Sequence, residues 1–183
     1  MTQSELLSYS FNDDEHIEFR LLSPDDSIEE LTRLLNKSYK VLADMGLNYV
    51  AATQDNSITI NRTRGAYKCY VGIYNNNIAA TISLYSPGPS DKSSWYSKAY
   101  VAKFGQFAVA PELQKYGIGS KMIDIVEGEA RKLENVSELA LDTAETAYHL
   151  IDFYEKKGYR YIETVQWGVT NYKSVILSKL LHT

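Results

Sequence analysis

The sequence predicts a fold of the α/β (α+β) class, with one mixed central sheet and helices on both of its faces. Strand-like and helix-like segments alternate through the middle of the chain, whereas the segments near both ends pair as hairpins. A length of 183 residues is sufficient for one hydrophobic core. We therefore expect a single domain over residues 1–183, with a loose N-terminal segment at 1–15.

The composition argues against several classes of protein. With 19 Lys and Arg against 23 Asp and Glu and no long basic run, the chain is not predicted to bind nucleic acid. Its single cysteine, Cys69, excludes an internal disulfide and lies in a strand-like run, where we expect it to be buried. The N-terminus lacks a signal-peptide pattern and no segment approaches about 20 apolar residues, which predicts a soluble, cytoplasmic protein without membrane contact. The composition is compatible with a monomer and with a homodimer.

The first part of the chain predicts a strand followed by two helices. Apolar and polar residues alternate over 17–21, as in a half-buried strand. Ser23 is expected to cap the first helix, whose apolar stripe continues until Gly46. Asp55–Arg64 predicts a shorter second helix capped by Asp55, with Arg62 in solvent.

A hairpin and a long connection are expected next. Tyr67–Tyr74 and Ile78–Tyr85 are rich in strand formers, and the asparagines at 75–77 tolerate the positive φ angles of a tight turn. The connection Ser86–Lys98 is longer than usual and contains Trp95. Two interpretations stay open: the connection lines a site, or one packed tryptophan holds it in place.

The second half of the chain alternates strands with helices. A buried strand is expected around Phe104–Ala110, and an apolar stripe predicts a helix over 118–133. Thr143 or Thr146 is expected to cap the next helix, which Gly158 ends. Three further strands are predicted, at Glu138–Asp142, Tyr159–Trp167 and Tyr172–Leu180.

A glycine-containing loop directly precedes the helix at 118–133: Gln114-Lys115-Tyr116-Gly117-Ile118-Gly119-Ser120. Glycines at a helix start let backbone amides approach a ligand, and those amides together with the helix dipole favour phosphate. Tight turning and close packing explain the same glycines. The loop lacks the Gly-Lys-Ser/Thr ending of a nucleotide P-loop and the third glycine of a dinucleotide fingerprint.

Two motifs identify a family. Gln114–Gly119 matches the pattern Gln/Arg-x-x-Gly-x-Gly/Ala, and Phe153–Tyr159 is similar to Leu-Tyr-x-Lys-x-Gly-Phe. By these motifs and by its order of elements, the chain resembles the GNAT superfamily of acyl-CoA N-acyltransferases from Ile17 to Leu180. The resemblance implies a mostly antiparallel sheet of about seven strands. In that fold the central strand splays from its neighbour and acyl-CoA enters the gap; Gly105 is a candidate for the backbone irregularity at the splay.

The resemblance also implies which residues bind acetyl-CoA. Backbone amides of Tyr116–Ser120 would hold the CoA pyrophosphate, with charge added by Lys115, whereas Lys121 fits a solvated face. Phe107–Val109 would lie beside the pantetheine arm, and the amide of Ala108 or Val109 would polarise the thioester carbonyl. The expected cofactor-binding residues are Phe107, Ala108, Val109, Gln114, Lys115, Tyr116, Gly117, Ile118, Gly119 and Ser120.

Tyr154 matches the tyrosine that in many relatives protonates the departing CoA thiolate. A phenol titrates near pH ~10 and a thiol near ~8.5, so a phenol is protonated at neutral pH and able to act as the general acid. A tyrosine on the apolar face of a helix is otherwise a core residue. Ala147 departs from the family pattern, because relatives commonly carry an Asn there, although Thr146 is adjacent.

No general base is assigned. Lys103, Gly105 and Gln106 occupy the region where relatives carry a strand carboxylate, and Glu112 is too close to the phosphate loop. Three residues qualify only if the fold brings them inward: Asp142, Glu145 and His149. The candidates for walls of an acceptor pocket are Tyr39, Tyr49, Tyr85, Trp95 and Trp167.

The sequence therefore predicts an acetyl-CoA-dependent N-acetyltransferase that acts on an amine of a small molecule, peptide or protein. No metal site is expected, because the histidines lack ligand spacing with cysteine or carboxylates, and no serine nucleophile elbow is present. Direct transfer in a ternary complex is therefore expected. The alternatives are an acyl-CoA sensor or scaffold without turnover and, more remotely, a nucleotide-binding module.

Overall fold

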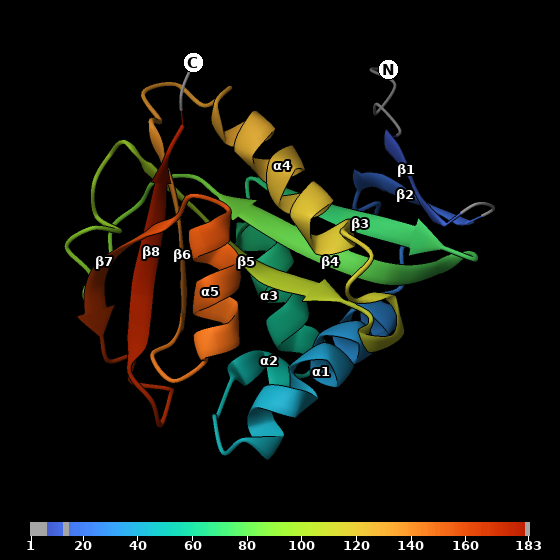
Figure 1. Cartoon of the computed structure of the whole chain (residues 1–183), viewed down its shortest axis with the longest axis horizontal. Helices are drawn as coiled ribbons and strands as arrows, with labels where there is room; N and C mark the ends of the chain where they lie inside the picture. The colour runs from blue at the N-terminus through green and yellow to red at the C-terminus, as the bar shows by residue number, and fades with distance from the viewer. Residues whose placement is uncertain (1–6, 13–14, 182–183) are drawn as a thin grey trace.

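The computed structural model describes residues 7–12 and 15–181 and contains one eight-stranded sheet with helices on both faces (Figure 1). The strands are β1 (Leu7–Asn12), β2 (Glu15–Leu21), β3 (Lys68–Tyr74), β4 (Asn77–Tyr85), β5 (Val101–Val109), β6 (Glu138–Ala144), β7 (Arg160–Val165) and β8 (Ser174–Leu180). The helices are α1 (Ile28–Asp44), α2 (Val50–Thr53), α3 (Asn56–Gly65), α4 (Ile118–Ala130) and α5 (Tyr148–Lys156), with a short 3-10 turn at Pro111–Leu113. Helices α4 and α5 lie on one face of the sheet and α1 and α3 on the other, with the short α2 beside α1 (Figure 1). The predicted fold class is confirmed, with one strand more than expected.

The sheet divides at its one parallel pair of strands. The strand order is β1-β2-β3-β4-β5-β6-β8-β7, and β5 with β6 is the parallel pair. This ladder joins only Val101–Lys103 to Glu138–Ala140. Beyond it, β5 stays paired with β4 as far as Val109, and β6 stays paired with β8 as far as Ala144. A gap therefore opens between β5 and β6.

Strand β5 carries an extra residue near the start of this gap. Thr81 of β4 faces Ala108, while Ser83 faces Gly105, so one more residue lies between the partners on β5 than on β4. Gln106 has a φ of 47°, in the left-handed region that residues other than glycine rarely adopt. The irregularity therefore lies directly after Gly105, and such a bulge bends its strand.

Strand β1 was not predicted. It pairs antiparallel with β2, where the sequence indicated a loose segment over residues 1–15; of that segment, 1–6 and 13–14 lie outside the described residues. Tyr9 and Phe11 pack against the main core, which explains why this polar-looking stretch is ordered as a strand. The alternation of its apolar residues is the signal that composition concealed.

The helices in the second half of the chain follow the prediction except at one cap. Neither Thr143 nor Thr146 caps α5, because β6 continues to Ala144 and takes Thr143 into the sheet. Ala147 occupies the cap position and makes no side-chain bond there. No helix in the described part of the chain is both long and apolar enough to cross a membrane.

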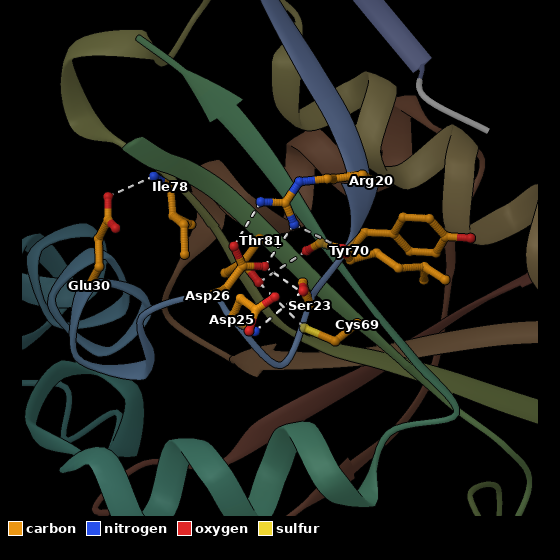
Figure 2. A network of polar contacts seen from close by, with 10 residues as sticks. Arg20, Ser23, Asp25, Asp26, Glu30, Cys69, Tyr70, Ile78 and Thr81 are labelled. Atoms are coloured by element: carbon orange, nitrogen blue, oxygen red, sulfur yellow. Dashed lines mark hydrogen bonds and ion pairs between the residues drawn. The ribbon is translucent and has the colours of Figure 1, made fainter. Parts of the chain in front are cut away.

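An ion pair fixes the turn between β2 and α1. Both guanidinium nitrogens of Arg20 donate to the Asp26 carboxylate at 2.7 Å, and the Ser23 amide donates to the same carboxylate (Figure 2). The hydrogen bond from Arg20 holds the pKa of Asp26 below its ordinary value. Ser23 therefore belongs to this turn, and the predicted cap is wrong: Ser27 caps α1.

The same region joins α1 to the hairpin of β3 and β4. Glu30 in the first turn of α1 accepts a hydrogen bond from the Ile78 amide at 2.7 Å (Figure 2). Cys69 on β3 is buried, as predicted, and its sulfur lies 3.8 Å from the Thr81 hydroxyl oxygen. Burial raises the pKa of the Cys69 thiol, so this cysteine behaves as a core residue.

We expect Asp26→Asn to lower the free energy of unfolding by about 1–3 kcal/mol at neutral pH, because it removes a charge-assisted pair from a partly buried turn. The folded-state pKa of Asp26 is lowered, so this stabilisation is present at neutral pH and lost as the pH falls below about 4. Urea unfolding at a series of pH values measures the difference. Asp25→Asn is the control and should change stability by less than about 0.5 kcal/mol; equal losses in both variants would contradict the assignment.

Candidate functional site

The gap between β5 and β6 exposes backbone groups of β5. The Ala110 amide donates to the Ala79 carbonyl at 2.8 Å. Because backbone groups alternate in direction along a strand, the N–H and C=O groups of Ala108 and Ala110 point towards β4. Those of Phe107 and Val109 then point into the gap. Two hydroxyls of α1 reach their carbonyl oxygens: Tyr39 donates to Phe107 at 3.0 Å, and Ser38 donates to Val109 at 3.1 Å.

The loop after β5 delivers α4 to the same end of the gap. Lys115 and Gly117 adopt φ angles of 73° and 81°, and no side chain caps α4 at Gly117. The Gln114 amide group donates to the Val109 carbonyl at 3.2 Å, and the Tyr9 hydroxyl donates to the Tyr116 carbonyl at 3.0 Å. Since no side chain among the described residues caps the start of α4, its first backbone amides are available to an anion.

A first cavity of about 540 Å³ lies between this loop, the end of β5, and helices α1 and α5. The structure brings all but two of the predicted cofactor-binding residues to its wall: Phe107, Ala108, Val109, Gln114, Lys115, Gly117, Gly119 and Ser120. Of the other two, the Tyr116 side chain is 42% exposed outside the cavity, and Ile118 is 1% exposed in the core. Lys121 does not line the cavity, whereas His149 does.

Tyr154 lines the first cavity from α5. Its ring is buried against Phe104 and Tyr159, with centroids 6.1 Å away in both cases. Within the described residues its hydroxyl has no hydrogen-bond partner, although a buried tyrosine hydroxyl usually has one. Burial, followed by the nearby Tyr39, Tyr49 and Asp142, raises the pKa of Tyr154 well above its ordinary value.

A second cavity of about 640 Å³ adjoins the first, because Tyr39 lines both. Four of the five aromatic residues predicted for an acceptor pocket line it: Tyr39, Tyr49, Tyr85 and Trp167. Trp95 does not; its ring contacts Tyr100 and the Arg160 guanidinium.

Both interpretations of the connection Ser86–Lys98 apply in part. The Glu163 carboxylate accepts hydrogen bonds from the Ser93 hydroxyl and the Trp95 amide, which hold the connection against β7. The next residue, Tyr96, lines the second cavity. The segment is therefore packed in place and also contributes to a site.

Three charged residues line the second cavity: Arg62, Lys103 and Asp142. Arg62 was expected in solvent, and Asp142 was one of three carboxylate or imidazole groups considered as a base. Of the others, Glu145 is exposed and lines neither cavity, and His149 belongs to the first cavity. Because Arg62, Lys103 and Asp142 come from α3, β5 and β6, no local sequence pattern could have joined them.

Asp142 is held by two aromatic side chains. The Tyr96 hydroxyl donates to Asp142 Oδ1 at 3.1 Å, and the Trp167 ring nitrogen donates to Oδ2 at 2.9 Å. Solvent in the cavity reaches the carboxylate, yet protein atoms surround it, and this partial desolvation raises its pKa. Desolvation also lowers the pKa of Lys103, while Asp142 acts in the opposite direction.

Comparison with known proteins agrees with this geometry. The model of the acetyltransferase (GNAT) family matches residues 28–159. No curated protein sequence matches the chain. The resemblance stated from the two sequence motifs is thus confirmed by a match to most of the chain.

Solved structures share the fold at low identity. PH1933 from Pyrococcus horikoshii is 19% identical, with a TM-score of 0.71 over 91% of this chain and 99% of its own. A GNAT family acetyltransferase from Elizabethkingia anophelis, with acetyl-CoA bound, is 18% identical, with a TM-score of 0.62 over 93% and 100%. The ribosomal-protein-S18-alanine N-acetyltransferase of Escherichia coli is 13% identical, with a TM-score of 0.68 over 91% and 95%.

Gly117→Ala should destabilise the loop at the start of α4. The residue has a φ of 81°, and an added Cβ would lie 2.6 Å from the Tyr9 hydroxyl oxygen. We expect a loss of about 1–3 kcal/mol in the free energy of unfolding, measured by urea titration. Gly128→Ala, inside α4, is the control: an added Cβ would meet no described atom within 4 Å, so it should stabilise the protein by up to about 1 kcal/mol. Similar effects of the two substitutions would contradict this account.

Proposed function

Because the chain belongs to the acetyltransferase (GNAT) family, whose enzymes use acetyl-CoA, we propose that it transfers the acetyl group directly to an amine of a small molecule, peptide or protein. The observation that carries the proposal is the pair of cavities that meet at Tyr39, beside the gap between β5 and β6. One cavity has the features of a cosubstrate site, and the other has room and charge for an acceptor.

Acetyl-CoA binds in the first cavity in this proposal. Its pyrophosphate accepts hydrogen bonds from the uncapped amides at the start of α4, where the helix dipole also favours negative charge. Lys115 on the cavity wall adds a positive charge. The pantetheine arm runs along β5, where Phe107 and Val109 face the gap, and their amides are the donors within reach of the acyl carbonyl. The Ala108 amide, considered from the sequence, faces β4 instead.

The acceptor must lose protons as the thioester is cleaved. An ammonium group with a pKa near ~10 gives up one proton, and Asp142 is the carboxylate of the second cavity that can receive it. The neutral nitrogen forms a bond to the acetyl carbon while the C–S bond breaks and its electron pair goes to sulfur. The nitrogen loses a second proton and the thiolate gains one, so the products are an amide, free CoA thiol and one released proton.

Tyr154 faces the departing sulfur in this arrangement. The raised pKa keeps its hydroxyl protonated and disfavours a stable phenolate. Tyr154 therefore donates a hydrogen bond that strengthens as negative charge develops on sulfur. If the phenol proton is transferred to sulfur, another proton returns to the Tyr154 oxygen at once, so no stable phenolate forms. Its hydroxyl has no hydrogen-bond partner in the described part of the chain, which leaves it free for this contact.

The release of free CoA thiol tests the proposed function. Wild-type protein should release thiol from acetyl-CoA in the presence of an amine from a broad panel, and Tyr154→Phe should lower kcat by about 10²-fold or more. Acetyl-CoA binding, measured by calorimetry, should persist in the variant, because the lost hydroxyl contacts only the leaving group.

Tyr148→Phe is the matched control for this substitution, since Tyr148 lies on the same helix, is 68% exposed and lines neither cavity. It should retain wild-type turnover. Unchanged turnover in Tyr154→Phe would refute the assigned role. Acetyl-CoA binding without acceptor-dependent thiol release would favour a sensor instead of an enzyme.

The pH profile tests Asp142. Its raised pKa predicts that kcat/KM is lost as the pH falls through a value above the ordinary carboxylate pKa of about 4, because the carboxylate must be ionised to receive a proton. Asp142→Asn should remove this acidic limb and lower kcat/KM by about 10²-fold or more. Asp152→Asn, at an exposed position of α5, is the control. An acidic limb that survives in Asp142→Asn would assign the titration to another group.

A further inference from the structure

The second cavity contains more positive than negative charge. Arg62 and Lys103 line it together with a single carboxylate, that of Asp142. Among the described residues, neither cation has a carboxylate within ion-pair distance. Lys103 is also partly desolvated, which lowers its pKa and makes an unpaired ammonium costly at this position. The cavity is therefore prepared for an anionic group.

Arg62 is directed by a buried polar network. Its guanidinium donates to the side-chain oxygen of Gln54 at 3.2 Å, and the Gln54 amide nitrogen donates to Gln106 at 3.0 Å and to Thr59 at 2.8 Å. Gln54 and Gln106 are only 3% and 9% exposed. The network fixes the side chain while leaving most of the guanidinium donors available, so Arg62 has a defined position in the wall.

A tyrosine separates the cationic and anionic groups. The ammonium of Lys103 lies 4.9 Å from the centre of the Tyr96 ring, and the hydroxyl at the far end of that ring donates to Asp142. Lys103 and Asp142 are thus held close together without forming an ion pair. A ligand that carries an ammonium and an anionic group a few bonds apart can form an ion pair with Asp142 and another with Lys103.

The remaining walls favour a flat apolar body. Four aromatic residues line the cavity together with the charged groups: Tyr49, Tyr85, Trp167 and Tyr172. A volume of about 640 Å³ falls within the range of small-molecule sites. A polyamine fits poorly, since it would meet two cations and one carboxylate.

We propose that the acceptor is a small molecule, namely an amino acid with an aromatic side chain or a close analogue in which an anionic group lies near the amine. Its ammonium binds Asp142, its carboxylate binds Lys103 and Arg62, and its ring packs on the aromatic walls. This inference rests on the proposed function and names the acceptor of the same site.

Matched amines test the inference. L-phenylalanine, L-phenylalaninamide and phenethylamine share the ring and the amine, but only the first carries a carboxylate. The amide controls for amine basicity, because its amine loses a proton more readily than that of the amino acid. We expect kcat/KM for phenylalanine to exceed the value for each of the others by about tenfold or more, since a site built to bind a charged group rejects ligands that lack it.

Variants locate the preference in the cavity. Lys103→Met and Arg62→Met should each move the ratio of kcat/KM for phenylalanine over phenylalaninamide towards one. Lys98→Met, which removes an exposed charge outside the cavity, should keep the wild-type ratio.

Three outcomes would overturn the inference: acetylation of the amide or phenethylamine as efficient as that of phenylalanine, a wild-type ratio in Lys103→Met and Arg62→Met, or no acetylation of any of the three. None of these outcomes would affect the proposed function if thiol release occurs with another amine. Failure of thiol release with every amine would count against both.

Discussion

The parting of β5 from β6 after three residue pairs determines the rest of the site. Each strand remains bound to a partner on its other side, so the sheet separates there without being broken. The backbone groups of β5 that lose a strand partner need other hydrogen bonds. Side chains of α1 and of Gln114, in the loop before α4, supply these hydrogen bonds at the Phe107 and Val109 carbonyls. The gap is thus stabilised before any ligand enters it.

Hydrogen bonds connect the bulge on β5 to the wall of the second cavity. Gln106 has a strained backbone conformation, and its side chain accepts a hydrogen bond from Gln54, which in turn binds Arg62. A residue held at positive φ persists only where its surroundings determine it. The same residue that bends β5 at the gap therefore belongs to the network that positions a cation in the second cavity. Gln106 thus links the bend of β5 at the gap to the position of Arg62 in the second cavity.

Local patterns predicted the parts of the site that lie close together in the sequence. The loop at Gln114–Ser120 and the position of Tyr154 followed from two short motifs, and the hairpin turn followed from its asparagines, two of which adopt positive φ. Asp142 and Lys103 come together through the parallel pairing of β5 with β6, which no local pattern encodes. Sequence reasoning therefore named most residues of the first cavity and four aromatic residues of the second, but not the charged residues Arg62 and Lys103 that line the second.

The second cavity holds two opposite charges, on Lys103 and Asp142, that do not form an ion pair with each other. Asp142 is held by Tyr96 and Trp167, whereas Lys103 lies over the Tyr96 ring without a carboxylate partner. A direct ion pair would satisfy both charges, and keeping them apart in a partly desolvated cavity raises the free energy of the empty protein. Unfavourable arrangements of charge of this kind are found mostly at functional sites, where a bound ligand supplies the missing partner. The separation of Lys103 from Asp142 is therefore best explained as preorganisation for an acceptor that carries both charges.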